Sequence, residues 1–350
     1  MDCETSSIRR WRTDEMAGGP LLEVRDLAAG FDSRHGLVKA LNGVSFVLEP
    51  GERLGIVGES GSGKSVTAHA ITGLLPSNAR VTGEARLDGV DLLQMSKRKM
   101  RHVRGERIGM VFQNPLHCLN PSMKIGAQIE EVILAHTDAD KREASRRSLE
   151  LLDQVGIPSP DRSAQEYPHL FSGGMRQRVM IAIALACKPQ IVIADEPTTA
   201  LDVTIQAQII DLLAETCKAY GAAVILITHD LGILAGFADR IVVMYAGRVV
   251  EQGDVDSIYY RPAHPYTLGL LRSVTRIDEA RRDRLVPITG NPPSPVLLPS
   301  GCAFHPRCPY TQPVCSERVP PLELKGGIDH PAACHFAEEV ATHRAGDAVQ

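Results

Sequence analysis

A glycine-rich stretch early in the sequence has the residue types of a loop that binds phosphate groups. Residues 58–65 read Gly-Glu-Ser-Gly-Ser-Gly-Lys-Ser and match the spacing G-x-x-x-x-G-K-[ST]. Such glycines let backbone N–H groups surround phosphates at the start of a helix, where the helix dipole favours anions. In this pattern Lys64 neutralises the β- and γ-phosphates of a nucleotide, and the hydroxyl of Ser65 ligates Mg²⁺. The residues that we assign to phosphate binding are Ser60, Gly61, Ser62, Gly63, Lys64, Ser65 and Val66.

Two adjacent carboxylates after a second apolar run could complete this chemistry. Residues 191–194 are Ile-Val-Ile-Ala, and Asp195 and Glu196 follow directly. Because Mg²⁺ takes oxygen ligands, Asp195 suits the shell of the metal ion. Glu196 can then orient and deprotonate a water molecule that attacks the γ-phosphate. Taken alone, the pair is equally consistent with an ordinary solvated strand end.

The elements that must position these residues alternate between strands and helices. An apolar run from Leu54 to Val57 precedes the glycine-rich loop, and a helical run to Leu75 follows it. Further along we expect helices over 174–187 and 205–220, with strands over 191–194, 224–228 and 240–250. This alternation predicts a largely parallel sheet covered by helices.

The alternation is interrupted between residues 114 and 171. Apolar residues recur at three- and four-residue spacing over Ile125 to Ala135 and over Ser145 to Val155, which predicts an inserted block that is mainly helical. From residue 286 to 321 proline becomes frequent, so we expect an extended segment there. We place a domain boundary near Tyr259.

Composition limits the classes of function. With 350 residues, of which 43% are hydrophobic, the chain can form one large α/β domain and a small appendage. The 38 basic and 42 acidic residues leave a formal net charge of -4, so we expect no nucleic-acid partner. The apolar runs are shorter than the roughly 20 residues that a membrane-spanning helix needs. The charged residues 1–20 are predicted to be a flexible tail and not a signal peptide.

The order of the motifs resembles that of the ABC ATPase family. Residues 112–115, Phe-Gln-Asn-Pro, look like the glutamine loop of this family, and residues 171–175, Phe-Ser-Gly-Gly-Met, look like its signature motif. Ala-Leu-Asp at 200–202 resembles the D-loop that contacts a partner cassette, and His229 resembles the switch histidine. Together with the phosphate loop and the acidic strand, these motifs cover residues 21–258.

The resemblance implies a catalytic set and a metal site. Glu196 would act as the general base, Gln113 would sense Mg²⁺ and the attacking water, and His229 would contact the γ-phosphate. The Mg²⁺ ligands that the resemblance implies are Ser65, Gln113 and Asp195.

The resemblance also implies residues that bind ATP from outside the phosphate loop. In this family the signature residues Ser172, Gly173 and Gly174 cap the γ-phosphate held by a partner cassette, and Asp202 belongs to the D-loop beside them. Phe31 resembles the aromatic residue that stacks on adenine; the alternative is an ordinary core phenylalanine on an early strand.

Four stretches are similar to the ATPase subunits of peptide importers. They are residues 126–129 (Gly-Ala-Gln-Ile), 171–186, 198–204 (Thr-Thr-Ala-Leu-Asp-Val-Thr) and 260–267 (Tyr-Arg-Pro-Ala-His-Pro-Tyr-Thr). The resemblance implies uptake of oligopeptides or dipeptides, with nickel or other small solutes carried by close relatives. It also implies two transmembrane permease subunits, a second ATPase subunit and an extracytoplasmic substrate-binding protein. The family favours a related chain as the second ATPase subunit, with an identical chain as the alternative. The chain would then lie peripherally on the cytoplasmic face of the inner membrane.

The motifs leave two alternatives to a transport ATPase. A soluble ABC ATPase of repair or translation would usually carry a very long coiled-coil insertion or two cassettes in one chain, and the sequence has neither. Alternatively, the C-terminal cysteines could make the chain a redox or metal sensor that regulates the ATPase.

Four cysteines crowd the C-terminal part of the sequence: Cys302, Cys308, Cys315 and Cys334. Some peptide-importer subunits resemble iron-sulfur proteins in this segment, which implies a [4Fe-4S] cluster. Four thiolates suit either an iron-sulfur cluster or structural zinc. The gaps lack the close C-x₂₋₄-C pairs of the usual zinc pattern, but His305, His330 and His335 keep zinc as one alternative. Reduced cysteines that bind no metal are the other. Because Lys64, Asp195 and Glu196 lie in another predicted domain, we expect loss of the cluster to leave ATP binding intact but to impair assembly with the permease.

Together these patterns predict an α/β fold. The resemblance implies a P-loop NTPase cassette of the ABC type, with a RecA-like core, an antiparallel β part and a helical subdomain inserted at about 114–175. The predicted division is a flexible tail (1–20), the nucleotide-binding domain (21–258), a small Pro- and Cys-rich extension of the oligopeptide-transporter type (259–340) and a second flexible tail (341–350).

Overall fold

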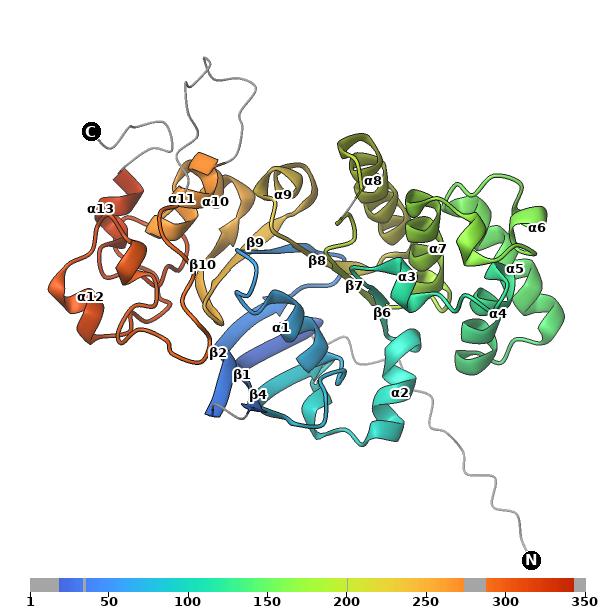
Figure 1. The fold of residues 1–350 in the computed structure, drawn as a ribbon, viewed down its shortest axis with the longest axis horizontal. Coiled ribbons are helices and arrows are strands. Elements are labelled where there is room, and N and C mark those ends of the chain that lie inside the picture. Colours follow the sequence, from blue (N-terminus) through green and yellow to red (C-terminus); the bar gives the residue numbers. More distant parts are fainter. Residues whose placement is uncertain (1–18, 34–35, 200, 274–287, 343–350) are drawn as a thin grey trace, which may run out of the picture.

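The structure is a computed structural model that describes residues 19–33, 36–199, 201–273 and 288–342. Figure 1 shows two sheets in the middle of the molecule, a helical block at one end and the C-terminal extension at the other. The two predicted tails lie outside the described residues except for their innermost positions. Among the described residues, no helix is both long and apolar enough to cross a membrane.

A six-stranded sheet in the order β10-β9-β3-β8-β7-β6 runs through the centre of the molecule. Its strands are β3 (Arg53–Val57), β6 (Ile108–Val111), β7 (Ile191–Asp195), β8 (Ala223–Thr228), β9 (Arg240–Tyr245) and β10 (Arg248–Asp254). All pair in parallel except β10, which is antiparallel to β9. Val57 lies opposite Thr228 and Asp195 opposite Ile227, so β3, β7 and β8 end at one edge. Ligands bind at this edge of parallel α/β sheets.

A second, antiparallel sheet has the strand order β2-β1-β4-β5. Its strands are β1 (Leu22–Ser33), β2 (Gly36–Leu48), β4 (Ala79–Leu87) and β5 (Val90–Asp91). One core cluster contains buried residues of both sheets, among them Leu22, Leu54 and Ile225. The antiparallel sheet therefore shares its core with one face of the central sheet.

The helices form three groups along the chain, with η marking 3₁₀ helices. Those nearest the phosphate loop in sequence are α1 (Lys64–Ile71), η1 (Leu92–Gln94) and α2 (Lys97–Glu106). The inserted block and the helices that follow it are α3 (Pro115–Cys118), α4 (Ile125–His136), α5 (Lys141–Gln154), α6 (Pro160–Ser163), η2 (Pro168–Leu170), α7 (Gly173–Leu185), α8 (Val203–Tyr220) and α9 (Leu231–Phe237). The C-terminal group is α10 (Val255–Tyr260), α11 (Pro265–Ser273), η3 (His305–Arg307), α12 (Pro313–Glu317) and α13 (Ala337–Thr342).

Local chemistry explains where two helices differ from the sequence prediction. The helix expected to reach Leu75 ends at Ile71, because Gly73 adopts a left-handed conformation with φ 63° that terminates a helix. The helix expected from Ser145 begins four residues earlier, because the side chain of Asp140 caps it by accepting a hydrogen bond from the Glu143 N–H at 2.8 Å.

The C-terminal extension folds back onto β10, the edge strand of the central sheet. Ala332 forms an antiparallel bridge with Glu251, and the N–H of Ala333 donates to the carbonyl oxygen of Val250 at 2.7 Å. The helix α10 spans the position near Tyr259 where we place the domain boundary.

A buried acid strengthens this attachment. Glu251 is 0% exposed and its carboxylate accepts hydrogen bonds from the backbone N–H groups of Ala263 and His264 and from His330 Nε2, the last at 2.7 Å. The other ring nitrogen of His330 lies 2.9 Å from Asp329 Oδ1. Burial lowers the pKa of His330, but the hydrogen bonds to Glu251 and Asp329 outweigh it and raise the pKa overall.

Candidate active site

The phosphate loop connects the carboxyl end of β3 to the start of α1. At Gly58, a Cβ atom would lie 2.2 Å from the carbonyl oxygen of Met244, so only glycine fits. Gly63 has φ 103°, in the left-handed region, and directly precedes α1. No side chain caps the N-terminus of α1. Its first N–H groups are therefore not occupied by a side-chain oxygen, as an anion site at a helix N-terminus requires.

The ammonium group of Lys64 lies inside this loop. Lys64 is 4% exposed, and its Nζ donates to the carbonyl oxygens of Gly58 at 2.7 Å and Glu59 at 3.1 Å. Burial lowers the pKa of Lys64, against the opposite effect of nearby carboxylates. The buried Oγ of Ser62 has no hydrogen-bond partner. Because unpaired buried hydroxyls are uncommon, this atom fits a loop that receives an oxyanion.

The other residues assigned to phosphate binding belong to the same turn. Ser60 and Gly61 are exposed, whereas Ser65 and Val66, in the first turn of α1, are half-buried. The loop thus exposes Ser60 and Gly61 to solvent, whereas Ser62 and Lys64 are buried.

The acidic strand ends beside the first turn of α1. Asp195, the last residue of β7, is buried, and its Oδ1 accepts a hydrogen bond from Ser65 Oγ at 2.8 Å. Burial raises the pKa of Asp195, against the effect of that hydrogen bond. Glu196 has φ 46°, and its N–H donates to the carbonyl oxygen of Ile227 at 2.9 Å. Consecutive strand residues point to opposite faces, so this left-handed turn lets both acids face the phosphate loop.

The Glu196 carboxylate lies among the residues predicted to act on the γ-phosphate. Its Oε2 accepts hydrogen bonds from Gln113 Nε2 at 2.9 Å and from Thr199 Oγ1 at 3.1 Å. Its Oε1 lies 3.7 Å from His229 Nδ1 and 3.8 Å from Lys64 Nζ. His229 is largely exposed, so one side of this cluster opens to solvent. Thr199 was not predicted from the sequence as a site residue. Its position three residues after Glu196 is the feature that could have indicated it.

The signature residues and Asp202 lie outside this cluster. Ser172 caps α7 by accepting a hydrogen bond from the Met175 N–H, and Asp202 caps α8 in the same way through Ile205 at 3.0 Å. The helix α7 packs against β6, α3, α4, α5 and α8, whereas α1 packs against β1, β2 and β7. Among the described residues, no hydrogen bond or ion pair joins Ser172, Gly173 or Gly174 to the chain's own phosphate loop.

Phe31 lies on β1 with its side chain half-buried. It belongs to neither of the two large core clusters of the described residues. Its role in adenine stacking stays a prediction.

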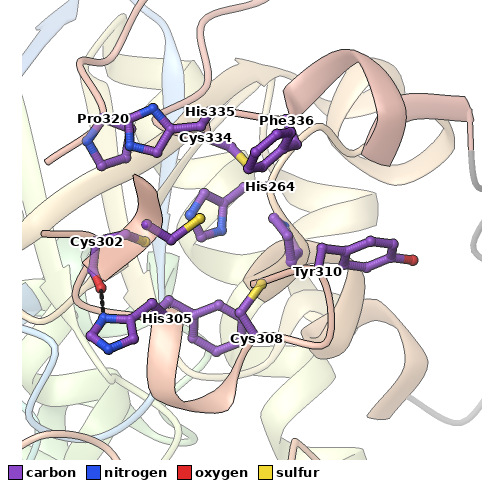
Figure 2. A pocket seen from close by; sticks show the side chains of 12 residues that line it. His264, Cys302, His305, Cys308, Tyr310, Pro320, Cys334, His335 and Phe336 are labelled. Atoms are coloured by element: carbon purple, nitrogen blue, oxygen red, sulfur yellow. Dashed lines mark hydrogen bonds between the residues drawn. The ribbon is translucent and has the colours of Figure 1, made fainter. Parts of the chain in front are cut away.

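All four C-terminal cysteines line one pocket of the extension. Figure 2 shows Cys302, Cys308 and Cys334 approaching this pocket from different sides, and Cys315 also lines it. Burial raises the pKa of Cys308 to about 11 and that of Cys334 to about 12, so these thiols hold their protons at neutral pH. No described cysteine forms a disulfide. The other walls include His264, Phe304, His305, Tyr310, His335 and Phe336.

The metal sites predicted from the sequence have their donors but no closed ligand shell. Within the described ranges, no three side chains of His, Cys, Asp or Glu are grouped closely enough to hold a metal ion. The four thiols therefore line one pocket but are not arranged closely enough to act together as metal ligands. A Mg²⁺ site does not need three such side chains, because that ion usually binds one or two carboxylates together with waters and substrate phosphates. Ser65 and Asp195 are in contact at that site, while the amide nitrogen of Gln113 faces Glu196.

The fold and the site define an ATP-binding cassette of the ABC type. A family model described as ABC transporter matches residues 41–199. A second model, described as the C-terminal region of oligopeptide/dipeptide transporters, matches residues 250–315. The two matches fall on the two parts of the chain that carry the Glu196 cluster and most of the cysteine pocket.

Known relatives and solved structures agree with this class. The chain is 50% identical over 303 residues to the oligopeptide transport ATP-binding protein OppD of Salmonella typhimurium, covering 87% of this chain and 90% of that protein. It is 51% identical over 304 residues to OppD of Bacillus subtilis, covering 86% and 85%. A dimeric structure of the ATP-binding cassette MJ0796, in a post-hydrolysis state with ADP and phosphate, superposes with a TM-score of 0.60 at 29% identity, covering 67% of this chain and 98% of that one.

The chain therefore belongs to the ABC transporter family, among its oligopeptide transport ATP-binding proteins. It is an ATP-hydrolysing transporter subunit.

Proposed function

We propose that this chain powers the import of oligopeptides by hydrolysing ATP between two cassettes of a membrane transporter. The substrate class is supported by the match of residues 250–315 to oligopeptide/dipeptide transporters and by relatives that carry that function in their names. The observation that carries the ATPase mechanism is the convergence of Lys64, Gln113 and His229 on the Glu196 carboxylate.

We assign residues 60–66 to the phosphates of ATP. Lys64 would exchange its bonds to the carbonyl oxygens of Gly58 and Glu59 for phosphate oxygens, which form stronger, charge-assisted hydrogen bonds. The Ser62 hydroxyl and the N–H groups at the start of α1 would supply further donors.

Ser65, Asp195 and Gln113 are the residues that would hold Mg²⁺. Bound Mg²⁺ supplies positive charge that neutralises the phosphate oxygens. The Ser65 hydroxyl and the Asp195 carboxylate already lie 2.8 Å apart, and Gln113 is hydrogen-bonded to the neighbouring acid. A buried carboxylate with a raised pKa gains from a cation beside it.

Glu196 orients and deprotonates the attacking water as the general base. Gln113 and Thr199 fix its carboxylate through hydrogen bonds to Oε2, so Oε1, which has no hydrogen bond this short, would take the proton. His229, exposed and 3.7 Å from Oε1, is in position to contact the γ-phosphate.

A second cassette completes the site. The N-terminus of α7 at Ser172, Gly173 and Gly174 would bind the γ-phosphate of the partner's ATP, with Asp202 at the junction of the two cassettes. The absence of bonds from these residues to the chain's own loop, within the described residues, supports action across a dimer. Phe31 would stack on adenine.

The assembly that we propose contains two transmembrane permease subunits, a second and related ATPase subunit and an extracytoplasmic substrate-binding protein. This chain would lie peripherally on the cytoplasmic face of the inner membrane. Residues 21–258 would form the nucleotide-binding domain, with 114–175 as its helical subdomain, and 259–340 the extension.

Transport in vesicles tests the substrate class. The chain is copurified with its permeases and second ATPase, reconstituted with the binding protein, and given labelled peptides of two to six residues. We expect ATP-dependent accumulation of oligopeptides and faster hydrolysis when they are present. Accumulation of Ni²⁺ but of no peptide contradicts the assignment.

We assign the four-cysteine pocket to a [4Fe-4S] cluster. The donor set fits, since such clusters are held by four cysteine thiolates, and all four thiols line a single pocket. The cluster would cross-link segments of an extension that has few regular elements between residues 288 and 336.

Anaerobic purification tests this assignment. We expect a brown protein with about four irons per chain, because thiolate-bound iron absorbs in the visible range whereas zinc is colourless. Replacing Cys308 by Ser should bleach the protein, and replacing the buried Cys217 of α8 should not. A colourless preparation with one zinc per chain contradicts the iron assignment and leaves the ATPase assignment intact.

A further inference from the structure

Glu59, in the phosphate loop, is held by two residues of the C-terminal extension. The guanidinium of Arg307 donates to both oxygens of its carboxylate, at 2.6 Å to Oε2 and 3.0 Å to Oε1. The backbone N–H of Glu59 donates to the hydroxyl of Tyr266 at 2.7 Å. One loop residue is therefore fixed through its side chain and its main chain by partners more than 200 positions away.

The Arg307–Glu59 pair is enclosed by aromatic rings. The Arg307 side chain is only 5% exposed, and its Cζ lies 5.9 Å from the ring centroids of both Tyr245 and Phe304. Its Nε donates to the carbonyl oxygen of Thr289 at 3.0 Å. A bidentate arginine–carboxylate pair is specific in geometry, and in a poorly hydrated setting it holds its partners strongly. This pair is thus a rigid contact and not a loose surface ion pair.

Glu59 passes this constraint on to the residue that binds phosphate. Its carbonyl oxygen accepts a hydrogen bond from Lys64 Nζ at 3.1 Å. The three polar groups of Glu59 consequently contact three different residues: the carbonyl contacts Lys64, the N–H contacts Tyr266 and the carboxylate contacts Arg307. The position of Arg307 therefore influences where the loop presents Lys64.

Arg307 does not itself line the cysteine pocket, but its neighbours in the chain His305 and Cys308 do. Arg307 ends the short helix η3 and lies between Cys302 and Cys308, both of which line the pocket. The His305 N–H donates to the Cys302 carbonyl oxygen at 3.0 Å, and the Arg307 N–H donates to that of Phe304 at 2.9 Å. One tight turn thus carries both pocket cysteines and the arginine that holds the phosphate loop.

We propose that Arg307 is a positioning residue for ATP binding, and that through Glu59 it transmits the state of the four-cysteine pocket to the phosphate loop. The second part rests on metal occupancy of the pocket, as proposed above; the first part rests on the contacts of Arg307 and Glu59 alone. The proposal replaces our expectation, based on the predicted domain division, that losing the cysteines leaves ATP binding intact.

A double-mutant cycle on the assembled transporter tests the first part. We expect Arg307→Gln and Glu59→Gln each to raise the Kd for MgATP about tenfold, the scale of one charged hydrogen-bonded pair. In Arg307→Gln, whose changed residue lies outside the phosphate loop, kcat at saturating ATP should stay within about twofold of the parent. Combining the two substitutions should give the same rise in Kd of about tenfold, because both remove one contact. An unchanged Kd in the single variants, or a rise of about a hundredfold in the double variant, contradicts the proposal.

Two milder variants keep the test independent of folding defects. Tyr266→Phe removes only the hydroxyl that accepts from Glu59 and keeps the buried ring, so it should raise Kd with an unchanged melting temperature. Arg261→Gln is the matched control, because Arg261 pairs with Asp329 inside the extension and does not contact the phosphate loop. Equal effects of Arg307→Gln and Arg261→Gln on Kd would mean that Arg307 has no specific positioning role.

Cys308→Ser tests the second part. We expect it to raise the Kd for MgATP in the parent chain but to have no further effect in the Arg307→Gln background. An unchanged Kd, or the same rise in both backgrounds, contradicts transmission through Arg307. Metal analysis separates the two proposals: a parent protein without iron or zinc contradicts the cluster, while the Arg307–Glu59 cycle is still decided by its own result.

Discussion

Glu196 combines an uncommon backbone conformation with four polar neighbours. A non-glycine residue with φ 46° is unusual and persists only where its surroundings hold it. Here the Ile227 carbonyl holds the main chain, and Gln113 and Thr199 hold the carboxylate. The sequence predicted the two acids at the strand end, but not this conformation or Thr199, because neither follows from an apolar run that ends in Asp-Glu.

We predict that tight binding of MgATP requires the ammonium group of Lys64. Lys64→Ala removes the only side-chain ammonium in the phosphate loop, so we expect the Kd for MgATP to rise at least about tenfold, the effect of one charged hydrogen bond or more. Lys218→Ala, an exposed lysine in the last turn of α8, is the control and should bind as the parent does. Equilibrium titration with a fluorescent ATP analogue measures both. Equal affinity of the two variants contradicts the role of Lys64.

Among the elements, periodicity located most of the helices and strands of the cassette. Buried strands such as β7 and β8 are continuous apolar runs, and α4 follows its apolar spacing to within one residue. The extension was harder to predict, because its order comes from long-range contacts. Ala332 and Glu251 are paired from positions 81 apart, and no local pattern indicates that contact. The predicted domain boundaries stay predictions.

The attachment of the extension to β10 leads to a prediction about pH. His330 has a raised pKa in the folded chain because its hydrogen bonds to Glu251 and Asp329 outweigh burial. Its stabilising contribution is therefore complete below its unfolded pKa of about 6.5 and is lost as pH rises through the higher folded pKa. We expect the difference in melting temperature between the parent and His330→Gln to shrink from pH 6 to pH 9.

Thermal unfolding followed by circular dichroism at several pH values measures that difference. His335→Gln serves as the control, since His335 is half-buried in the same extension and its ring contacts the Arg318 carbonyl oxygen and Phe336 but no acid. If the gap between the parent and His330→Gln is constant or widens toward pH 9, the charged form of His330 is not what stabilises the attachment.

In the whole molecule, segments far apart in sequence act on one loop. The extension lies beside β10 (Figure 1) and reaches back to the phosphate loop through Arg307 and Tyr266. The signature helix α7 lies beside the helical block (Figure 1), and among the described residues its first residues form no hydrogen bond to that loop. In the proposed mechanism this signature segment acts on the nucleotide of a partner cassette.

A variant of the signature segment tests this role. Ser172→Arg removes the α7 cap and places a bulky cation where the partner's phosphate would bind, so we expect ATP binding at the chain's own loop to remain while the ATP-dependent dimer fails to form. Titration measures the first property and size-exclusion chromatography with ATP the second. Loss of ATP binding in Ser172→Arg, as in Lys64→Ala, contradicts the action of this segment on a partner.

The most direct test of the account is single-turnover hydrolysis by Glu196→Gln. Glutamine keeps the shape of the side chain but cannot accept the proton of the attacking water. We expect MgATP to bind as in the parent, hydrolysis to fall at least about a hundredfold, the usual cost of losing a general base, and ATP-bound dimers to accumulate. Hydrolysis at near the parental rate contradicts the assignment of Glu196 as the base, and with it the mechanism proposed for the cluster around it.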